Sequence, residues 1–192
     1  MAKLTLWMQM SLDGYAEGPD HAFDWPLVGP RLQRAFFDEL RHADAFVYGR
    51  HIYEMMAAVW PAVDANPGAP AEAREFAQVW LPMAKYVFSQ TLTDPGWNTT
   101  VVRDDVATAI RNLVARSRHG VVAFGGPRFA ATLMHLGLVD DYQLFVHPVL
   151  LGDGTPLFAG ITDRHRLRLV TSRTYDDTVV AIRYASATPR GS

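Results

Sequence analysis

The chain has 192 residues, of which 49% are hydrophobic and 11% aromatic, and its formal net charge is −2. This size and composition suit one folded domain with a proper core, and the charge gives no basic surface for nucleic acid or an anionic membrane. The absence of cysteine excludes disulfides, thiolate metal sites and cysteine nucleophiles. We find no signal peptide and no apolar stretch long enough to span a bilayer, so we expect a cytoplasmic protein without membrane or nucleic-acid partners.

Strand-like and helix-like patterns alternate through the first two thirds of the chain. Short apolar runs predict buried strands at 4–10, 45–48, 86–88, 99–102 and 121–124. The helical spacing of apolar residues predicts helices at 31–43, 50–58, 71–80, from Asp104 or Asp105 to Val114, and from Pro127 to near Gly137. The stretches 15–30 and 61–70 are rich in glycine and proline, so we expect loops there, the first of them mobile.

The last third of the chain contains strands that pair with one another. Residues 142–151 form a long predicted strand, and the alternating runs 167–175 and 178–184 predict a hairpin around Asp176 and Asp177. The whole order indicates an α/β domain with a mostly parallel central sheet and an antiparallel C-terminal hairpin. We expect a single domain over residues 1–186, followed by a tail at 187–192.

Several common α/β sites are absent from the sequence. The seven histidines form no HxxxH or HxH pattern, so we expect no metal site. There is no G-x-S-x-G elbow of an α/β-hydrolase, no Walker A loop and no G-x-G-x-x-G dinucleotide fingerprint.

A glycine pair, Gly125-Gly126, separates the predicted strand 121–124 from the helix that begins at Pro127. This arrangement lets a phosphate group approach free backbone N–H groups at the positive end of a helix. The alternative is that the glycine pair is only a tight turn.

Four segments in order resemble the dihydrofolate reductase-like fold. Within that fold they resemble the stand-alone relatives of the riboflavin-biosynthesis reductase domain, the RibD C-terminal domain. The segments are SLDG at 11–14, YGRHIYE at 48–54, KYVFSQTL at 85–92, and the stretch from FGG at 124–126 to HPVLLGDGTPLF at 147–158. Together they cover nearly the whole chain.

The resemblance implies a three-layer fold and an NADPH-dependent reductase, and it assigns a set of residues to the cofactor. Arg50 offers a planar guanidinium for phosphate, although a surface helix cap is the alternative. The segment 89–91 is placed near the adenosine 2′-phosphate, with a simple turn as the alternative. The full set is Gly49, Arg50, His51, Ser89, Gln90, Thr91, Gly125, Gly126, Pro127, Arg128 and Phe129.

The resemblance also implies a substrate cleft between the first strand and the first helix. Its expected substrate-binding residues are Trp7, Gln9, Gln33, Phe37 and Val146. Core packing is the alternative for the two aromatic residues. We predict Asp13 and Tyr53 as catalytic residues. The alternatives are that Asp13 only caps its turn and that a water molecule is the proton donor.

Two departures from the family patterns bear on the substrate. Gln33 stands where dihydrofolate reductases carry an acidic residue, and a neutral amide cannot make the same charged pair. Tyr15 follows the SLDG segment where the riboflavin-pathway reductases usually have a basic residue.

These expectations lead to one main hypothesis and two alternatives. The main hypothesis is an NADPH-dependent reductase of a small pyrimidine- or pteridine-like heterocycle, resembling 5-amino-6-(5-phosphoribosylamino)uracil reductase, with the segment 15–30 as a lid. The alternatives are a dihydrofolate reductase and a catalytically silent, nucleotide-binding homologue. The resemblance implies a homodimer in each case.

Overall fold

The computed structural model describes residues 2–187, so most of the expected tail lies outside the described residues. The strands are β1 (Leu4–Ser11), β2 (Tyr15–Glu17), β3 (Ala45–Gly49), β4 (Lys85–Phe88), β5 (Thr99–Val102), β6 (Val121–Phe124), β7 (Asp141–His147), β8 (Thr155–Pro156), β9 (Leu167–Tyr175) and β10 (Val179–Ser186). The helices are α1 (Pro30–Leu40), α2 (Arg50–Asp64), α3 (Ala71–Trp80), α4 (Val106–Arg116) and α5 (Pro127–His135), with a short 3₁₀ helix, η1 (Pro19–His21).

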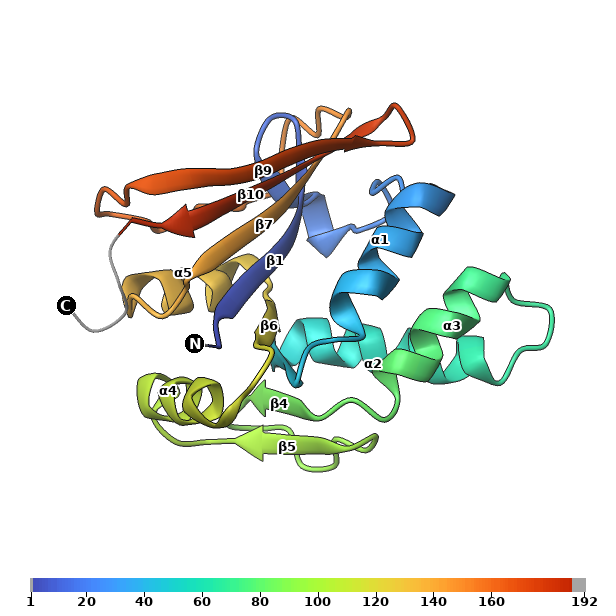
Figure 1. Cartoon of the computed structure of the whole chain (residues 1–192), viewed down its shortest axis with the longest axis horizontal. Helices are drawn as coiled ribbons and strands as arrows, with labels where there is room; N and C mark the ends of the chain where they lie inside the picture. The colour runs from blue at the N-terminus through green and yellow to red at the C-terminus, as the bar shows by residue number, and fades with distance from the viewer. Residues whose placement is uncertain (1, 188–192) are drawn as a thin grey trace.

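One eight-stranded sheet runs through the molecule in the order β5-β4-β3-β6-β1-β7-β10-β9. The six strands from β5 to β7 are parallel, while β10 is antiparallel to both of its neighbours. The expected α/β class, with a mostly parallel sheet and an antiparallel C-terminal hairpin, is therefore confirmed (Figure 1).

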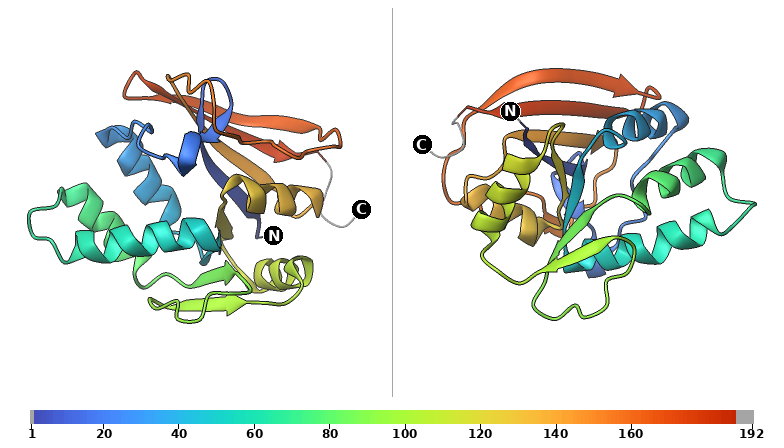
Figure 2. Two further views of the ribbon diagram at one scale, coloured as in Figure 1. Left: turned by 180° about the vertical axis from the view of Figure 1, so that it is seen from behind. Right: turned by 60° about the horizontal axis from the view of Figure 1, so that its bottom comes forward.

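The helices form a layer on each face of the sheet, as Figures 1 and 2 show. Side chains of β1 alternate between these layers, as strand geometry requires. Leu4, Leu6 and Met8 belong to the core that includes residues of α4 and α5. Trp7 points to the opposite core, which includes residues of α1, α2 and α3. The first strand thereby carries an aromatic side chain to the face where the long helices lie.

Several predicted boundaries were wrong, including the end of the first helix, which was expected at 31–43 and spans Pro30–Leu40. Residues 15–30 are not a continuous loop, because β2 pairs with β8 and η1 follows it. Helix α2 extends to Asp64 with Pro61 inside it, since one missing N–H near the helix end leaves the other backbone bonds intact. Strand β7 ends at His147, before Pro148, which has no N–H to donate to a ladder.

The hairpin turn between β9 and β10 also fixes the position of α1. Asp176 and Asp177 both have positive φ, 52° and 51°, as a tight hairpin turn requires. The Asp176 carboxylate accepts hydrogen bonds from the backbone N–H groups of Arg31 (3.2 Å) and Leu32 (3.1 Å). The C-terminal hairpin therefore caps the N-terminus of the first helix.

Asp44 ties the start of β3 to the turn before β6, and its replacement tests the pH dependence of stability. Its Oδ2 accepts the N–H groups of Arg118 (2.8 Å), His119 (2.6 Å) and Gly120 (3.0 Å). Burial by itself would raise the pKa of Asp44, but these hydrogen bonds outweigh it and lower the pKa to about 2 from 3.8. The ionised carboxylate therefore stabilises the fold above pH ~4, and this contribution disappears as the pH falls towards 2.

We expect Asp44→Asn to lower the free energy of unfolding by about 2 kcal/mol at pH 6, which is the shift expressed as energy. Urea unfolding at pH 6 and near pH 2.5 measures it, and the difference from the unmodified protein should shrink at the lower pH. Asp104→Asn is the control, because it makes the same substitution at an exposed aspartate. A difference that stays constant with pH would contradict the assignment.

Candidate active site

The carboxyl ends of the central parallel strands meet beside two helix N-termini. Gly49 ends β3 and directly precedes α2, and Gly125-Gly126 follows β6 and precedes α5. The chain passes from β1 to β3 and returns later to insert β6 between them, and such a crossing point is where open α/β sheets bind ligands. Because the N-cap residues are Gly49 and Gly126, no side chain caps either helix.

A cavity of about 570 Å³ lies over these two helix ends, and we call it the helix-end groove. Both N-termini direct unpaired backbone N–H groups and a positive dipole end at it, which is the environment that phosphate prefers. A Cβ on Gly49 would lie 3.1 Å from Cβ of Phe129, so glycine permits the close approach of the two helices. The lining residues are Glu17, His21, Gly49, Arg50, His51, Ile52, Phe88, Gly126, Pro127, Arg128, Phe129, Thr132 and Thr155.

Arg50 stands at the rim of the groove beside the turn that follows β4. Its Nε lies 2.7 Å from the Glu54 carboxylate, and its Nη1 donates to the Thr91 hydroxyl. The Ser89 hydroxyl accepts the N–H groups of Thr91 and Leu92, while the Gln90 amide donates to the Arg103 carbonyl. The segment 89–91 is therefore a hydrogen-bonded turn, and the structure brings its Thr91 to Arg50.

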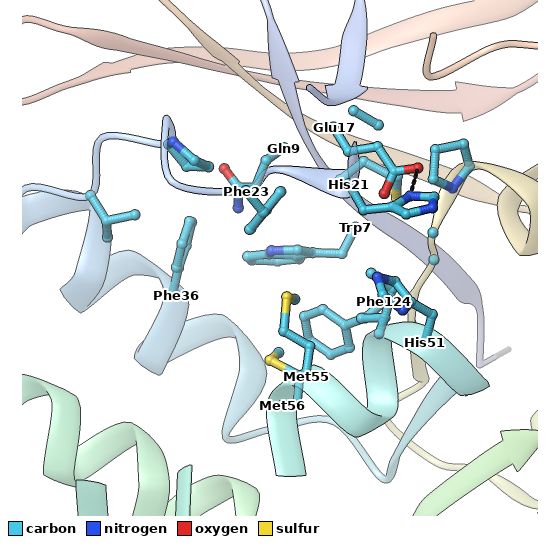
Figure 3. A pocket seen from close by; sticks show the side chains of 18 of the residues that line it. Trp7, Gln9, Glu17, His21, Phe23, Phe36, His51, Met55, Met56 and Phe124 are labelled. Carbon is cyan, nitrogen blue, oxygen red and sulfur yellow. Dashed lines mark ion pairs between the residues drawn. The ribbon is translucent and has the colours of Figure 1, made fainter. Parts of the chain in front are cut away.

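A second cavity of about 260 Å³, the aromatic pocket, lies between the end of β1 and helices α1 and α2 (Figure 3). Trp7 lies at its centre, with ring centroids 5.3 Å from Phe36 and 6.3 Å from Phe124. Met55 and Met56 approach Trp7 from α2. Flat aromatic faces with adaptable methionines suit a planar apolar ring.

The two cavities share one boundary. Both are lined by Glu17, His21, His51, Ile52, Gly126 and Pro127. An extended ligand can therefore place an anionic part in the helix-end groove and a ring in the aromatic pocket.

The structure brings some of the predicted substrate residues to the aromatic pocket and leaves others outside it. Trp7, Gln9 and Gln33 line the pocket. Phe37 does not, because it points between Arg34 and Arg41, whose guanidinium carbons lie 5.7 and 5.6 Å from its ring. Phe36, one residue earlier, takes the place expected for Phe37.

The prediction of Val146 as a pocket residue was also wrong by one residue. Alternate residues of β7 face opposite sides of the sheet, and Phe145 is the one that packs 4.8 Å from Trp7. Val146 therefore faces away from the pocket. The apolar spacing of the first helix already placed Phe36 on its buried side, so the sequence contained a signal for Phe36. No such signal indicated which face of β7 carries Phe145.

Neither predicted catalytic residue offers a proton to the aromatic pocket. Asp13 accepts hydrogen bonds from the Ser11 hydroxyl (2.7 Å) and the Gly152 N–H (2.8 Å). The Ser11 bond first, and then those from the backbone, hold the pKa of Asp13 below its usual range. Tyr53 donates its proton to the Pro95 carbonyl, and burial raises its pKa. Both side chains hold turns in place.

Three titratable residues meet at the shared boundary, where His51 was predicted for the cofactor and Glu17 and His21 were missed from the sequence. Nδ1 of His21 lies 3.0 Å from Oε1 of Glu17, and the His21 and His51 rings are 5.2 Å apart. The ligand atoms of all three lie within 4.8 Å of one another, a spacing that suits a metal ion. These residues matched no metal motif in the sequence. His51 lies far from Glu17 and His21 in the chain and meets them only because the fold brings their segments together. The pair of Glu17 and His21 is drawn in Figure 3.

Comparisons with known proteins agree with this architecture. The chain is 30% identical over 182 residues to the uncharacterized protein YyaP of Bacillus subtilis, covering 95% of this chain and 94% of that protein. Among solved structures, it is similar to one from Shewanella sp. PV-4, provisionally named a riboflavin biosynthesis protein, with a TM-score of 0.76 and 20% identity over 97% of this chain and 99% of that one.

Two enzymes share the fold at lower identity. One is a diaminohydroxyphosphoribosylaminopyrimidine deaminase/5-amino-6-(5-phosphoribosylamino)uracil reductase from Thermotoga maritima, with a TM-score of 0.67, 15% identity and coverage of 97% of this chain and 57% of that one. The other is dihydrofolate reductase from Enterococcus faecalis complexed with NADP(H), with a TM-score of 0.60, 11% identity and 97% coverage of both chains. The fold is thus dihydrofolate reductase-like.

The family comparison covers nearly the whole described chain. The RibD C-terminal domain family matches residues 2–181, a span that includes both helix N-termini, the aromatic pocket and most of the C-terminal hairpin. The chain belongs to the RibD C-terminal domain family.

Proposed function

We propose that this protein is an NADPH-dependent reductase of a small pyrimidine- or pteridine-like heterocycle. The observation that carries the proposal is the junction of two cavities, one over two uncapped helix N-termini and the other lined by aromatic rings. Family membership and the named reductases among the structural neighbours support the same reading.

The residues present fit a dinucleotide cofactor. Backbone N–H groups at the starts of α2 and α5 would hold its diphosphate, and Arg50 beside Thr91 would hold the adenosine 2′-phosphate. NADPH, when bound, supplies a hydride. Trp7, Phe36 and Phe124 would orient the substrate ring and exclude water from it. Glu17 and His21 at the shared boundary are the titratable groups best placed to exchange a proton with the ring.

One alternative keeps support from a specific observation. Asp13 and Tyr53 are committed to turns, which favours a nucleotide-binding homologue without catalytic activity. A dihydrofolate reductase is less favoured, because the side chain at the expected place in α1 is Gln33 and carries no charge.

A homodimer is part of the same proposal. Strand β9 is an edge strand of the sheet, and Leu169 and Val170 on it are 52% and 43% exposed. A long edge strand with exposed apolar side chains gains cover when a second copy of the chain packs against it. Light scattering of the purified protein measures the oligomeric state.

Calorimetric titration with NADPH, and separately with NADH, tests the proposed function. We expect NADPH to bind at least about 10-fold more tightly, because one charged hydrogen bond to its extra phosphate contributes about 1.5–3 kcal/mol. Oxidation of NADPH in the presence of heterocycles, followed by the loss of nicotinamide absorbance, then distinguishes an enzyme from a silent homologue. Absence of binding by both cofactors at millimolar concentration would overturn the proposal.

A further inference from the structure

The substrate end of the aromatic pocket carries neutral polar groups in place of charges. Away from the boundary with the helix-end groove, its polar side chains are Gln9 on β1 and Gln33 on α1. Among the described residues, none of those that line this pocket is a lysine or an arginine. Arg50 and Arg128 line the helix-end groove instead.

His147 fixes the orientation of the Gln9 side chain. The backbone N–H of Leu27 donates to Nδ1 of His147 at 3.0 Å, so this ring nitrogen must be unprotonated. Neutral imidazole then carries its proton on Nε2, which lies 2.6 Å from Oε1 of Gln9. His147 is fully buried, and burial lowers its pKa to about 4, in keeping with a neutral ring at pH 7.

Because Oε1 of Gln9 accepts from His147, its amide nitrogen is left to face the pocket. Figure 3 shows this nitrogen on the side of Gln9 that faces Trp7 and Phe36. The nitrogen carries two hydrogens and has no lone pair to accept with. The pocket therefore presents a donor of fixed direction above an aromatic floor, and a donor left unpaired there costs about 1–3 kcal/mol.

A phosphate group at the substrate end of this pocket would meet no lysine or arginine among the described lining residues. Transfer of an unpaired anion into an apolar cavity is strongly unfavourable. Glu17, whose side chain is only 10% exposed, adds a carboxylate at the boundary and would repel a second anion. The neutral end of the pocket thus differs from a site for a phosphoribosyl substrate.

We propose that the substrate is an uncharged, unphosphorylated heterocycle with a ring carbonyl that accepts a hydrogen bond from Nε2 of Gln9. Gln9 is a specificity-determining residue, and His147 is a positioning residue that acts through it. The inference rests on the proposed reductase function and narrows its substrate class.

Two matched ligand pairs test the inference by calorimetry at pH 7 in the presence of saturating NADP⁺. Lumazine carries ring carbonyls where 2,4-diaminopteridine carries amino groups. Uridine 5′-monophosphate differs from uridine only in its phosphate. We expect lumazine to bind at least about 10-fold more tightly than its diamino analogue, by the cost of an unpaired donor. Uridine should bind more tightly than its phosphate.

The reverse order in either pair, or no binding of lumazine at millimolar concentration, would overturn the inference. NADPH binding is measured separately on the same protein. Normal NADPH binding together with a reversed ligand order would leave the reductase proposal standing and remove the inference about its substrate.

Variants separate a directional role from a merely structural one. Gln9→Leu should weaken lumazine binding about 10-fold and leave 2,4-diaminopteridine nearly unchanged, because the lost donor served the carbonyl. His147→Phe should reduce the ratio of the two affinities towards one, because the Gln9 amide is then free to rotate. Gln78→Leu, at an exposed position on α3, is the matched control and should change neither affinity.

Gln9→Leu keeps the hydrogen bond between His147 and Leu27, so it tests the inference by itself if His147→Phe does not fold. If Gln9→Leu lowered the affinities for lumazine and 2,4-diaminopteridine equally, Gln9 would have only a packing role, and the proposed specificity would be contradicted.

Discussion

Replacing Arg50 with alanine is expected to weaken NADPH binding by about 10- to 100-fold, the range of one charged hydrogen bond to phosphate. NADH binding should change by less than about 3-fold, because NADH lacks the 2′-phosphate that Arg50 is proposed to hold. The structural reason is that the Arg50 guanidinium bridges the helix-end groove and the Thr91 turn. Calorimetry with the two cofactors gives both affinities.

Arg50→Lys and Arg111→Ala complete this experiment. Lysine retains the charge without the planar fork, so we expect an intermediate loss of NADPH affinity. Arg111 is exposed on α4, outside both cavities, and its replacement should leave the cofactor affinities unchanged. An equal loss of NADPH and NADH affinity in Arg50→Ala would mean that the guanidinium binds a group common to both cofactors, and would contradict its assignment to the 2′-phosphate.

Replacing Lys85 with methionine is expected to lower the free energy of unfolding by about 3 to 5 kcal/mol, the cost of several buried carbonyls left without a donor. Lys85 is 1% exposed. Its ammonium donates to the carbonyls of Trp80 (2.7 Å), Leu81 (3.2 Å) and Met83 (2.7 Å), which uses all three hydrogens. It also lies 4.3 Å from the Trp80 ring.

The Lys85 ammonium thus closes the C-terminal end of α3, where the helix dipole favours a cation. Urea unfolding of Lys85→Met should show a midpoint lower by about 1–2 M, given slopes typical of this size. Arg111→Ala serves again as the control, with an expected change within about 0.5 kcal/mol for an exposed side chain. A change below about 1 kcal/mol in Lys85→Met would mean that other donors satisfy these carbonyls.

The sequence carried enough information to locate the main strands and the helix starts that form the helix-end groove. Both depend on local patterns, since the apolar runs of parallel strands and the glycines before α2 and α5 are contiguous in the chain. The helix starts at Arg50 and Pro127 agreed with prediction to the residue. The proton donor and the occupants of the predicted cofactor sites stay predictions.

Side-chain direction was harder to predict than element position. An error of one residue moves a side chain by about 100° on a helix and to the opposite face on a strand. This is why Phe36 lines the pocket in place of Phe37, and why Phe145 faces the pocket side while Val146 does not. No spacing rule in the sequence links Gln9 to His147, which lie far apart in the chain and meet because β1 and β7 are adjacent.

The sequence by itself determined the fold class, the order of the main strands and helices, and the two glycine-led helix starts, because these follow from short-range periodicity and backbone freedom. Tertiary structure alone decided the rest of the site. The parallel pairing of β1 and β7 placed His147 against Gln9. Strand β2 pairs with β8, and Glu17 and His21 lie beside His51. The distant hairpin turn caps α1 through Asp176. Contacts between residues distant in sequence depend on strand order and register, which local patterns do not encode.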